Sequence, residues 1–187
     1  MDISLMVEGQ NGLTWDKWSN ILKKSEAAGL AGVFRSDHFF IGEQQESLEP
    51  YLSFVMASLQ TSRIRFGPMV TPVTFRPPVN VGRMAAQIDQ LSNGRFVLGL
   101  GGGWNEEEHK AYGVNFPPVG ERLNRLEEAI NLMKGLWSRV CRSVAAATWP
   151  ARTTFLPAMP VSNWLRKTMA SESPLETRPP NGLLLDR

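Results

Sequence analysis

The feature that most constrains the fold is a strand–helix–strand pattern between residues 63 and 108, which leads into a glycine-rich run. A short apolar segment at 64–70 is followed by Pro77 and Pro78, where a helix begins, because proline in the first helical turn loses no hydrogen bond. Apolar residues then recur at helical spacing, and a second apolar segment at 96–98 precedes the glycines. Two strands joined by a helix are typical of a parallel sheet.

The preceding residues show the same alternation. Residues 3–7 predict a strand, and Thr14 is a candidate N-cap of a helix that ends at Gly29. Residues 32–35 predict the next strand, and Pro50 begins the next helix. The apolar side of that helix is predicted to consist of Leu52, Val55, Met56 and Leu59.

A last helical region starts at Asn105, is interrupted around 113–120 and resumes up to Trp137. Its buried stripe is predicted to consist of Leu123, Leu126, Ile130, Met133 and Trp137. Four strand–helix units without a hairpin turn predict an α/β fold with parallel strands covered by helices. Two architectures remain, an open doubly wound sheet and a partial TIM (β/α)8 barrel. A complete barrel takes about 250 residues, so four units make up roughly half of one.

Composition excludes several classes of protein. With 42% hydrophobic and 20% charged residues the chain is typical of a globular protein, and its formal charge of +2 gives no argument for nucleic-acid binding. The single cysteine, Cys141, excludes an internal disulfide framework. No apolar run approaches the roughly 20 residues that span a bilayer, and the N-terminus lacks the basic region of a signal peptide. We therefore expect a soluble, cytoplasmic protein without membrane partners.

The composition changes near residue 138. The last 49 residues contain one of the 16 glycines and six of the 13 prolines, and no helical or strand period persists in them. The sequence therefore predicts a folded domain at 1–138 and an irregular, disordered tail at 139–187. The erratic use of Pro, Arg, Trp and Ser in the tail suggests a truncated or frameshifted gene product. For the function of the chain, one hypothesis is that the basic residues of the tail bind nucleic acid.

Candidate functional residues follow the predicted strands, because parallel α/β folds place active sites at the carboxyl ends of strands. Asp37 and His38 come directly after the strand at 32–35. A histidine beside a carboxylate can exchange a proton near neutral pH. The alternative interpretation is a histidine that only caps the next loop.

The glycine-rich run at 99–103 predicts either a loop that lets a ring system or a phosphate approach the backbone, or a tight strand-to-helix turn. Trp104 stands where a dinucleotide fingerprint needs its third glycine, and no P-loop lysine follows. His109 is predicted to lie at the surface beside the acidic residues 106–108, whose charges favour a helix N-terminus. The two histidines are far apart in the sequence, so no metal site is predicted.

The chain contains five motifs, which in sequence order are LMVEGQ, FRSDHFF, GPMVTPVTFRPP, GRFVLGLGGGWNEEEHKAYG and ERLNRLEEAINLMKGLW. Together these motifs resemble the bacterial luciferase-like superfamily, and more narrowly its coenzyme F420 (deazaflavin)-dependent oxidoreductases. The resemblance covers residues 1 to about 138. It implies a TIM-type barrel and redox chemistry at a flavin or deazaflavin ring. FMN is the alternative cofactor, because luciferase-like monooxygenases share the scaffold and use reduced flavin with oxygen.

The resemblance also implies roles for individual residues. The family's Ser-Asp-His motif maps onto residues 36–38, which implies that His38 is a proton donor or acceptor beside the ring. A bulge after the third strand, often with a non-prolyl cis peptide that supports the ring, maps to about 69–71. The glycine-rich turn maps onto 101–104, and the acidic position after it falls at Glu107. The implied cofactor-binding residues are Asp37, Met69, Val70, Thr71, Gly101, Gly102, Gly103 and Glu107.

The expected function is therefore hydride transfer or monooxygenation of a small organic substrate with coenzyme F420 or FMN. Complete family members are roughly twice as long as the matched part, and barrels commonly bind a cofactor phosphate after strands seven and eight. We therefore expect this chain alone to be weakly active or inactive. The alternative is a non-catalytic half-barrel fragment that assembles with a partner or as a homodimer, because the first and fourth strands leave unpaired edges.

Overall fold

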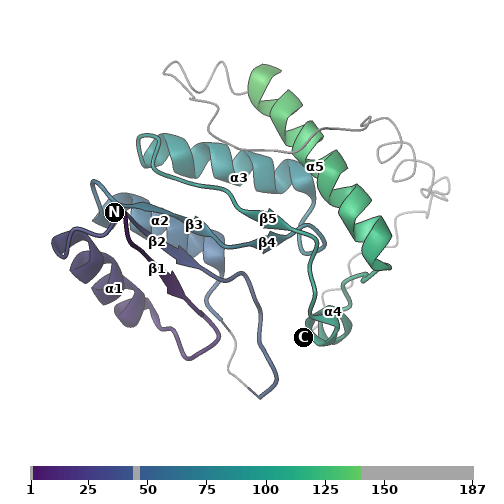
Figure 1. The fold of residues 1–187 in the computed structure, drawn as a ribbon, viewed down its shortest axis with the longest axis horizontal. Coiled ribbons are helices and arrows are strands. Elements are labelled where there is room, and N and C mark those ends of the chain that lie inside the picture. Colours follow the sequence, from purple (N-terminus) through teal and green to yellow (C-terminus); the bar gives the residue numbers. More distant parts are fainter. Residues whose placement is uncertain (1, 44–46, 140–187) are drawn as a thin grey trace, which may run out of the picture.

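The computed structural model describes residues 2–43 and 47–139 (Figure 1). The elements are β1 (Ser4–Val7), α1 (Trp15–Ala27), β2 (Gly32–Arg35), α2 (Pro50–Gln60), β3 (Arg65–Pro68), β4 (Thr71–Pro72), α3 (Pro78–Leu91), β5 (Leu100–Gly101), α4 (Glu106–Ala111) and α5 (Val119–Arg139). None of the helices in these two ranges is both long enough and apolar enough for a transmembrane span. The tail predicted at 139–187 lies outside the described residues apart from its first position, so it stays a prediction.

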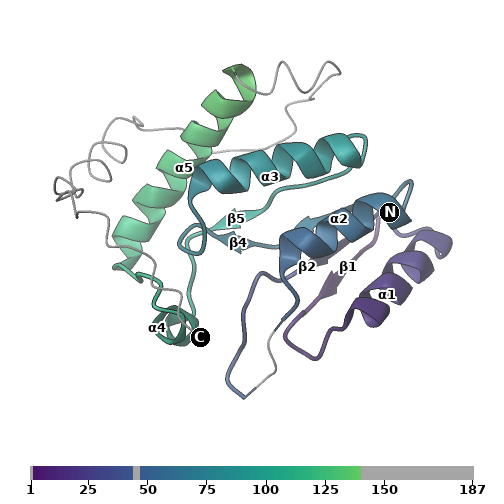
Figure 2. The ribbon, with the colours of Figure 1, turned by 180° about the vertical axis from the view of Figure 1, so that it is seen from behind.

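Every strand pairing within the described residues is parallel, and this confirms the predicted α/β class. β1, β2 and β3 form one sheet in that order, and β4 and β5 form a second, two-stranded ladder. Helices α1, α2, α3 and α5 form a row in which each helix contacts the next (Figure 1). The strands point toward the side of the molecule where the short helix α4 lies (Figure 2).

β3 and β4 are two parts of one predicted strand, separated by a bulge. Phe66 lies opposite Phe96, whereas Thr71 lies opposite Leu100, so five residue steps on one side match four on the other. This excess of one residue is the signature of a β-bulge. The peptide bond between Met69 and the following valine, within the bulge, is cis. Both features lie where the family resemblance implied them.

The fourth strand differs from the prediction at 96–98. Phe96 forms only an isolated bridge, and the paired strand β5 begins at Leu100, inside the glycine-rich run. The backbones approach closely before that point, because a Cβ added to Gly67 would overlap the carbonyl oxygen of Val97. The apolar triplet indicated a strand, but the paired ladder after the bulge consists of Leu100 and Gly101 opposite Thr71 and Pro72.

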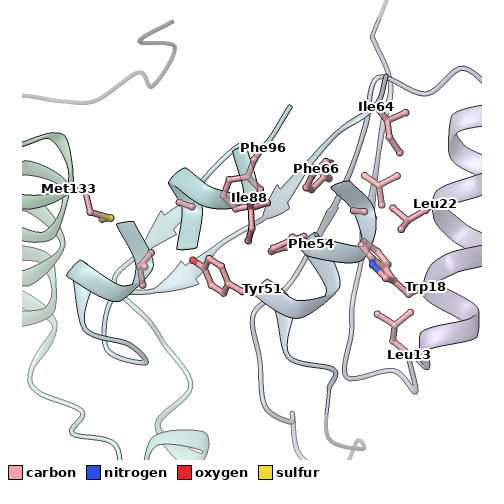
Figure 3. Close-up of a cluster of buried hydrophobic side chains, with 14 of the residues drawn as sticks. Leu13, Trp18, Leu22, Tyr51, Phe54, Ile64, Phe66, Ile88, Phe96 and Met133 are labelled. Atoms are coloured by element: carbon pink, nitrogen blue, oxygen red, sulfur yellow. The ribbon is translucent and has the colours of Figure 1, made fainter. Parts of the chain in front are cut away.

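The hydrophobic core lies between the strands and the row of helices (Figure 3). Trp18 of α1 lies at one end of the cluster, and its indole N–H donates to the carbonyl oxygen of Ser53, 2.8 Å away. Met133 of α5 lies at the opposite end, against α3, where a Cβ added to Gly82 would come within 2.9 Å of its Cγ. The completely buried apolar residues are Trp18, Leu22, Val33, Phe54, Ala57, Ile64, Phe66 and Ala85.

The buried face of α2 also differs from the prediction. Leu52 is 60% exposed and Leu59 is 70% exposed, whereas Tyr51 and Phe54 are buried. Aromatic rings bury more apolar area than leucine side chains, so they take the core side of this helix. The stripe predicted on α5 is likewise only partly buried, since Leu123 at its start is exposed.

β1 is an edge strand within the described residues, because β2 is its sole partner there. The apolar side chains of Leu5 and Met6 on this strand, and of Ile3 directly before it, are exposed. Exposed apolar edge strands favour association with another chain. The homodimer expected through sheet edges stays a prediction.

Replacing Gly67 by alanine tests the close approach of the backbones before the bulge. Because the added Cβ would overlap the carbonyl oxygen of Val97, the strands must shift apart. We expect a loss of about 3 kcal/mol in the free energy of unfolding. Urea denaturation followed by circular dichroism measures this loss.

Gly135 of α5 provides the matched control. Among the described residues, no atom outside the backbone of the helix itself lies within 4 Å of a Cβ added there, and alanine is the better helix former by about 1 kcal/mol. Gly135→Ala should therefore leave the stability unchanged or raise it. Equal stabilities of Gly67→Ala and the wild type would contradict the close approach.

Candidate functional site

A cavity of about 320 Å³ opens at the carboxyl ends of the strands. Three segments line it: residues 36–38 after β2, the bulge residues Met69 and Val70 with Pro72, and residues 101–104 at the end of β5 and after it. The structure therefore brings together segments that the sequence predicted separately. A larger cavity of about 430 Å³ lies beside α1, but none of the predicted site residues lines it.

One nitrogen of the His38 imidazole ring contacts a buried carboxylate. Its Nδ1 lies 2.8 Å from the Oε2 atom of Glu108. A carboxylate oxygen accepts hydrogen bonds, so this contact is a hydrogen bond when Nδ1 carries the hydrogen, and Nε2 of the neutral ring then keeps a lone pair. Nε2 has no hydrogen-bond partner among the described residues. The ring of Trp104 meets the imidazole edge-on, with 5.5 Å between the ring centroids.

Glu108, which the sequence did not single out, is completely buried. Its Oε1 accepts hydrogen bonds from the backbone N–H groups of Phe39 at 2.6 Å and Phe40 at 3.1 Å. Its Oε2 faces Nδ1 of His38. The carboxylate therefore joins α4 to the loop after β2 through both of its oxygens.

The surroundings of His38 raise the pKa of its imidazole. Burial by itself lowers this pKa, but the hydrogen bond to Glu108 and its negative charge outweigh burial, and Glu8 and Asp37 add to the effect. The protonated ring is therefore stabilised in the folded state. This contribution to stability is present below the pKa of the unfolded chain and is lost as the pH rises through the higher pKa of the folded state.

Asp37 lines the same cavity, but both of its oxygens have partners. Arg76 donates to them at 2.6 and 3.1 Å, and the hydroxyl of Thr71 donates to Oδ2 at 2.8 Å. Arg76 also donates to Glu49 at 2.7 Å. Burial raises the pKa of Asp37, and the bonds from Arg76 and Thr71 oppose this rise. Asp37 therefore ties the end of β2 to β4, directly after the bulge.

Arg35, at the end of β2, forms hydrogen bonds to the loop that follows this strand. Its buried guanidinium donates to the hydroxyls of Ser47 and Ser53 and to the carbonyl oxygens of Ser36 and Leu48. Burial lowers its pKa to about 10, which still leaves the group charged at neutral pH. The loop that carries His38 is thus anchored through several hydrogen bonds.

The prediction for His109 is wrong, because this residue is 1% exposed. Its Nδ1 lies 2.6 Å from the carbonyl oxygen of Asn105, and its Nε2 lies 2.7 Å from the hydroxyl of Thr74. The ring packs against Phe75 and Phe116. The acidic run indicated a solvated helix, but α4 has six residues and buries one side.

The structure does not bring Glu107 to the site. Its side chain is exposed, whereas the adjacent Glu108 is buried. Successive helical residues lie about 100° apart around the axis, so neighbours can face opposite environments. No pattern in the acidic run distinguishes the two glutamates, and the partner of Glu108 lies 70 residues away.

The bulge and the residue after the glycine-rich run present apolar side chains to the cavity. Met69 and Val70 are 52% and 42% exposed, and Trp104 is 66% exposed, so apolar surface faces the opening. A Cβ added to Gly101 would come within 2.5 Å of Val70, and Gly103 has a φ of 78°, which favours glycine. Within the described ranges no group of three metal-binding side chains occurs. The arrangement can therefore hold a ring and exchange a proton at His38.

Residues 3–174 match the family model of luciferase-like monooxygenases. The chain is 34% identical over 118 residues to the F420-dependent glucose-6-phosphate dehydrogenase of Amycolatopsis mediterranei, a match that covers 62% of this chain and 35% of that protein. The chain thus spans about a third of the length of the curated relatives it matches.

Two solved structures have similar folds. An F420-dependent secondary alcohol dehydrogenase in complex with an F420–acetone adduct has a TM-score of 0.67 and 22% identity, over 74% of this chain and 42% of that chain. The FMN-bound oxygenating constituent of 3,6-diketocamphane monooxygenase from Pseudomonas putida has a TM-score of 0.60 and 20% identity, over 74% and 40%. At these identities the likeness shows the fold alone.

Replacing Arg76 by methionine tests the anchoring of Asp37. The substitution leaves a buried carboxylate without its charged partner, so we expect a loss of about 3–5 kcal/mol in the free energy of unfolding. Adding Asp37→Asn removes the unpaired charge, so the double variant should be more stable than Arg76→Met alone. Chemical denaturation of the wild type, Arg76→Met, Asp37→Asn and the double variant measures these losses.

The exposed Arg83, on α3, provides the matched control. Arg83→Met should change the stability by about 0.5 kcal/mol or less. Additive losses in the double variant would contradict a direct coupling between Asp37 and Arg76.

Proposed function

Because the chain belongs to the luciferase-like monooxygenase family, we propose that its cavity binds the deazaflavin ring of coenzyme F420 and serves an oxidoreductase. The substrate is a small organic molecule that gives or receives a hydride. The observation that carries this proposal is the His38–Glu108 pair beside an exposed apolar bulge. The similarity to a relative named as F420-dependent supports this choice of cofactor.

The bulge and the glycine-rich loop provide the binding surface. Met69 and Val70 offer apolar side chains on which a ring can rest, and Gly101 keeps the loop close to Val70. Asp37 and Thr71 hold the strand after the bulge in place. A bound deazaflavin ring supplies the acceptor or donor of a hydride.

His38 handles the proton that accompanies the hydride. In the oxidation of an alcohol, the lone pair of Nε2 accepts the hydroxyl proton and the substrate becomes a carbonyl compound. In the reverse direction, the protonated ring returns this proton to the carbonyl oxygen. The raised pKa makes the neutral ring a stronger base, which favours the transfer of the hydroxyl proton to Nε2 in the direction of alcohol oxidation.

The proposed architecture is a partial (β/α)8 barrel. Parallel strands and a row of successive helices support it, and so do the folds of the similar structures. Barrels commonly bind a cofactor phosphate after strands seven and eight. No such strands lie within the described residues, so we expect contacts with the ring to dominate cofactor binding. We also expect turnover by this chain alone to be weak.

FMN is the second candidate cofactor, because one of the similar structures holds FMN. With FMN, the same site would serve the monooxygenation of a small organic substrate. The ring-binding surface would be shared, so only direct binding measurements separate the two cofactors.

Replacing Met69 by aspartate tests the ring-binding surface. A charge on the apolar bulge opposes the burial of a ring there, so we expect the Kd for coenzyme F420 to rise at least tenfold, which is about 1.4 kcal/mol. Anaerobic titrations monitored by absorbance and fluorescence measure this Kd, and the same titrations are made with FMN.

Leu59→Asp is the matched control, because Leu59 is exposed on α2 and does not line the cavity. This variant should bind coenzyme F420 like the wild type. Binding of FMN without binding of coenzyme F420 would favour the second candidate, and binding of neither would contradict the proposal.

A further inference from the structure

We propose that Glu108 is the positioning residue that selects the Nδ1–H tautomer of His38 and thereby makes Nε2 the proton-accepting atom at the cavity. This inference rests on the proposed function, in which His38 exchanges a proton with the substrate. It concerns a residue outside the sequence motif that contains His38, since Glu108 lies on α4.

The other hydrogen bonds of Glu108 leave its Oε2 atom to contact the imidazole of His38. Its Oε1 is occupied by the backbone N–H groups of Phe39 and Phe40, and its Oε2 faces Nδ1 of His38 at 2.8 Å. A neutral imidazole carries its hydrogen on either nitrogen, and the partner decides which. Because Oε2 only accepts, it favours the tautomer with the hydrogen on Nδ1.

The same carboxylate also fixes where the ring lies. Phe39 and Phe40 directly follow His38, so Glu108 holds both the backbone of this loop and the side chain within it. Glu108 is completely buried, and its position depends on α4, whose N-cap Asn105 is also buried. The orientation of His38 is therefore set by a helix 70 residues further along the chain.

Other charged groups near His38 do not replace Glu108. Glu8 and Asp37 are the further acidic residues that act on the imidazole, and both act through their charge alone, without a hydrogen bond to it. Asp37 is paired with Arg76 at 2.6 Å. Within residues 2–43 and 47–139, only Glu108 combines a negative charge with a direct contact to Nδ1.

Replacing Glu108 by glutamine separates these effects in a side chain of the same shape. The amide has one acceptor oxygen and one donor nitrogen. The two backbone N–H groups need the oxygen, so the NH₂ group must face Nδ1 of His38. We therefore expect Glu108→Gln to move the ring hydrogen to Nε2 and to lower the pKa of His38, because the neighbouring negative charge is gone.

Nitrogen-15 NMR of the cofactor-free protein tests this directly. The chain contains two histidines, and His109 serves as an internal reference, because both of its nitrogens have partners. In the wild type, neutral His38 should show the hydrogen on Nδ1. In Glu108→Gln the shifts of its two nitrogens should exchange, while those of His109 stay unchanged.

Glu107→Gln is the matched control, because it removes the same charge from the adjacent, exposed position. It should leave the tautomer of His38 unchanged and should lower its pKa less than Glu108→Gln does. An unchanged tautomer in Glu108→Gln, or the same exchange in Glu107→Gln, would overturn the proposal.

The wild-type spectrum keeps the test decisive even if Glu108→Gln does not fold. Neutral His38 with its hydrogen on Nε2 in the wild type would refute the proposal without any variant. Because these measurements use no cofactor, they are independent of the titrations with coenzyme F420 and FMN. Failure of both cofactors to bind would therefore remove the proposed function while the tautomer result still decided the role of Glu108.

Discussion

The candidate site depends on the hydrogen bonds that close around Asp37. This buried carboxylate joins the end of β2 to Thr71 of β4 and to Arg76 in the segment that leads into α3. Between β3 and β4 the chain makes a bulge, and the bulge side chains face the cavity instead of the core. A bulge adds a residue that the ladder cannot pair, so bonds from outside the ladder help to hold it, in addition to the backbone hydrogen bond from Met69 to Arg35. The bonds of Asp37 provide that support.

The short helix α4 supplies a second group of buried polar contacts. Glu108 and His109 are adjacent in the sequence, yet Glu108 contacts the loop after β2 and His109 contacts Thr74 after β4. One turn of helix thus connects two of the segments that form the cavity. The hydrogen bonds of both residues are satisfied, as burial of polar groups requires. α4 therefore sets the positions of neighbouring loops as well as the orientation of His38.

Local signals in the sequence predicted most of the elements. Thr14 caps α1, Pro50 begins α2, and β2 covers the predicted residues. These features depend on neighbouring residues, because a cap or a proline acts within one turn of a helix. The faces of the helices were less predictable. On α2 the sequence offered both leucines and aromatic residues, and only packing against the other strands and helices decided that Tyr51 and Phe54 lie inside.

The sequence by itself determined the alternation of strands and helices, the parallel class of the sheet and the segments that line the cavity. It did so because apolar periodicity, glycine and proline act over a few residues. Only the tertiary structure decided that Glu108, and not Glu107, faces His38, and that His109 is buried. A helix of six residues is too short for periodicity to define its inner side, and a contact between residues 38 and 108 requires the intervening strands and helices to be folded.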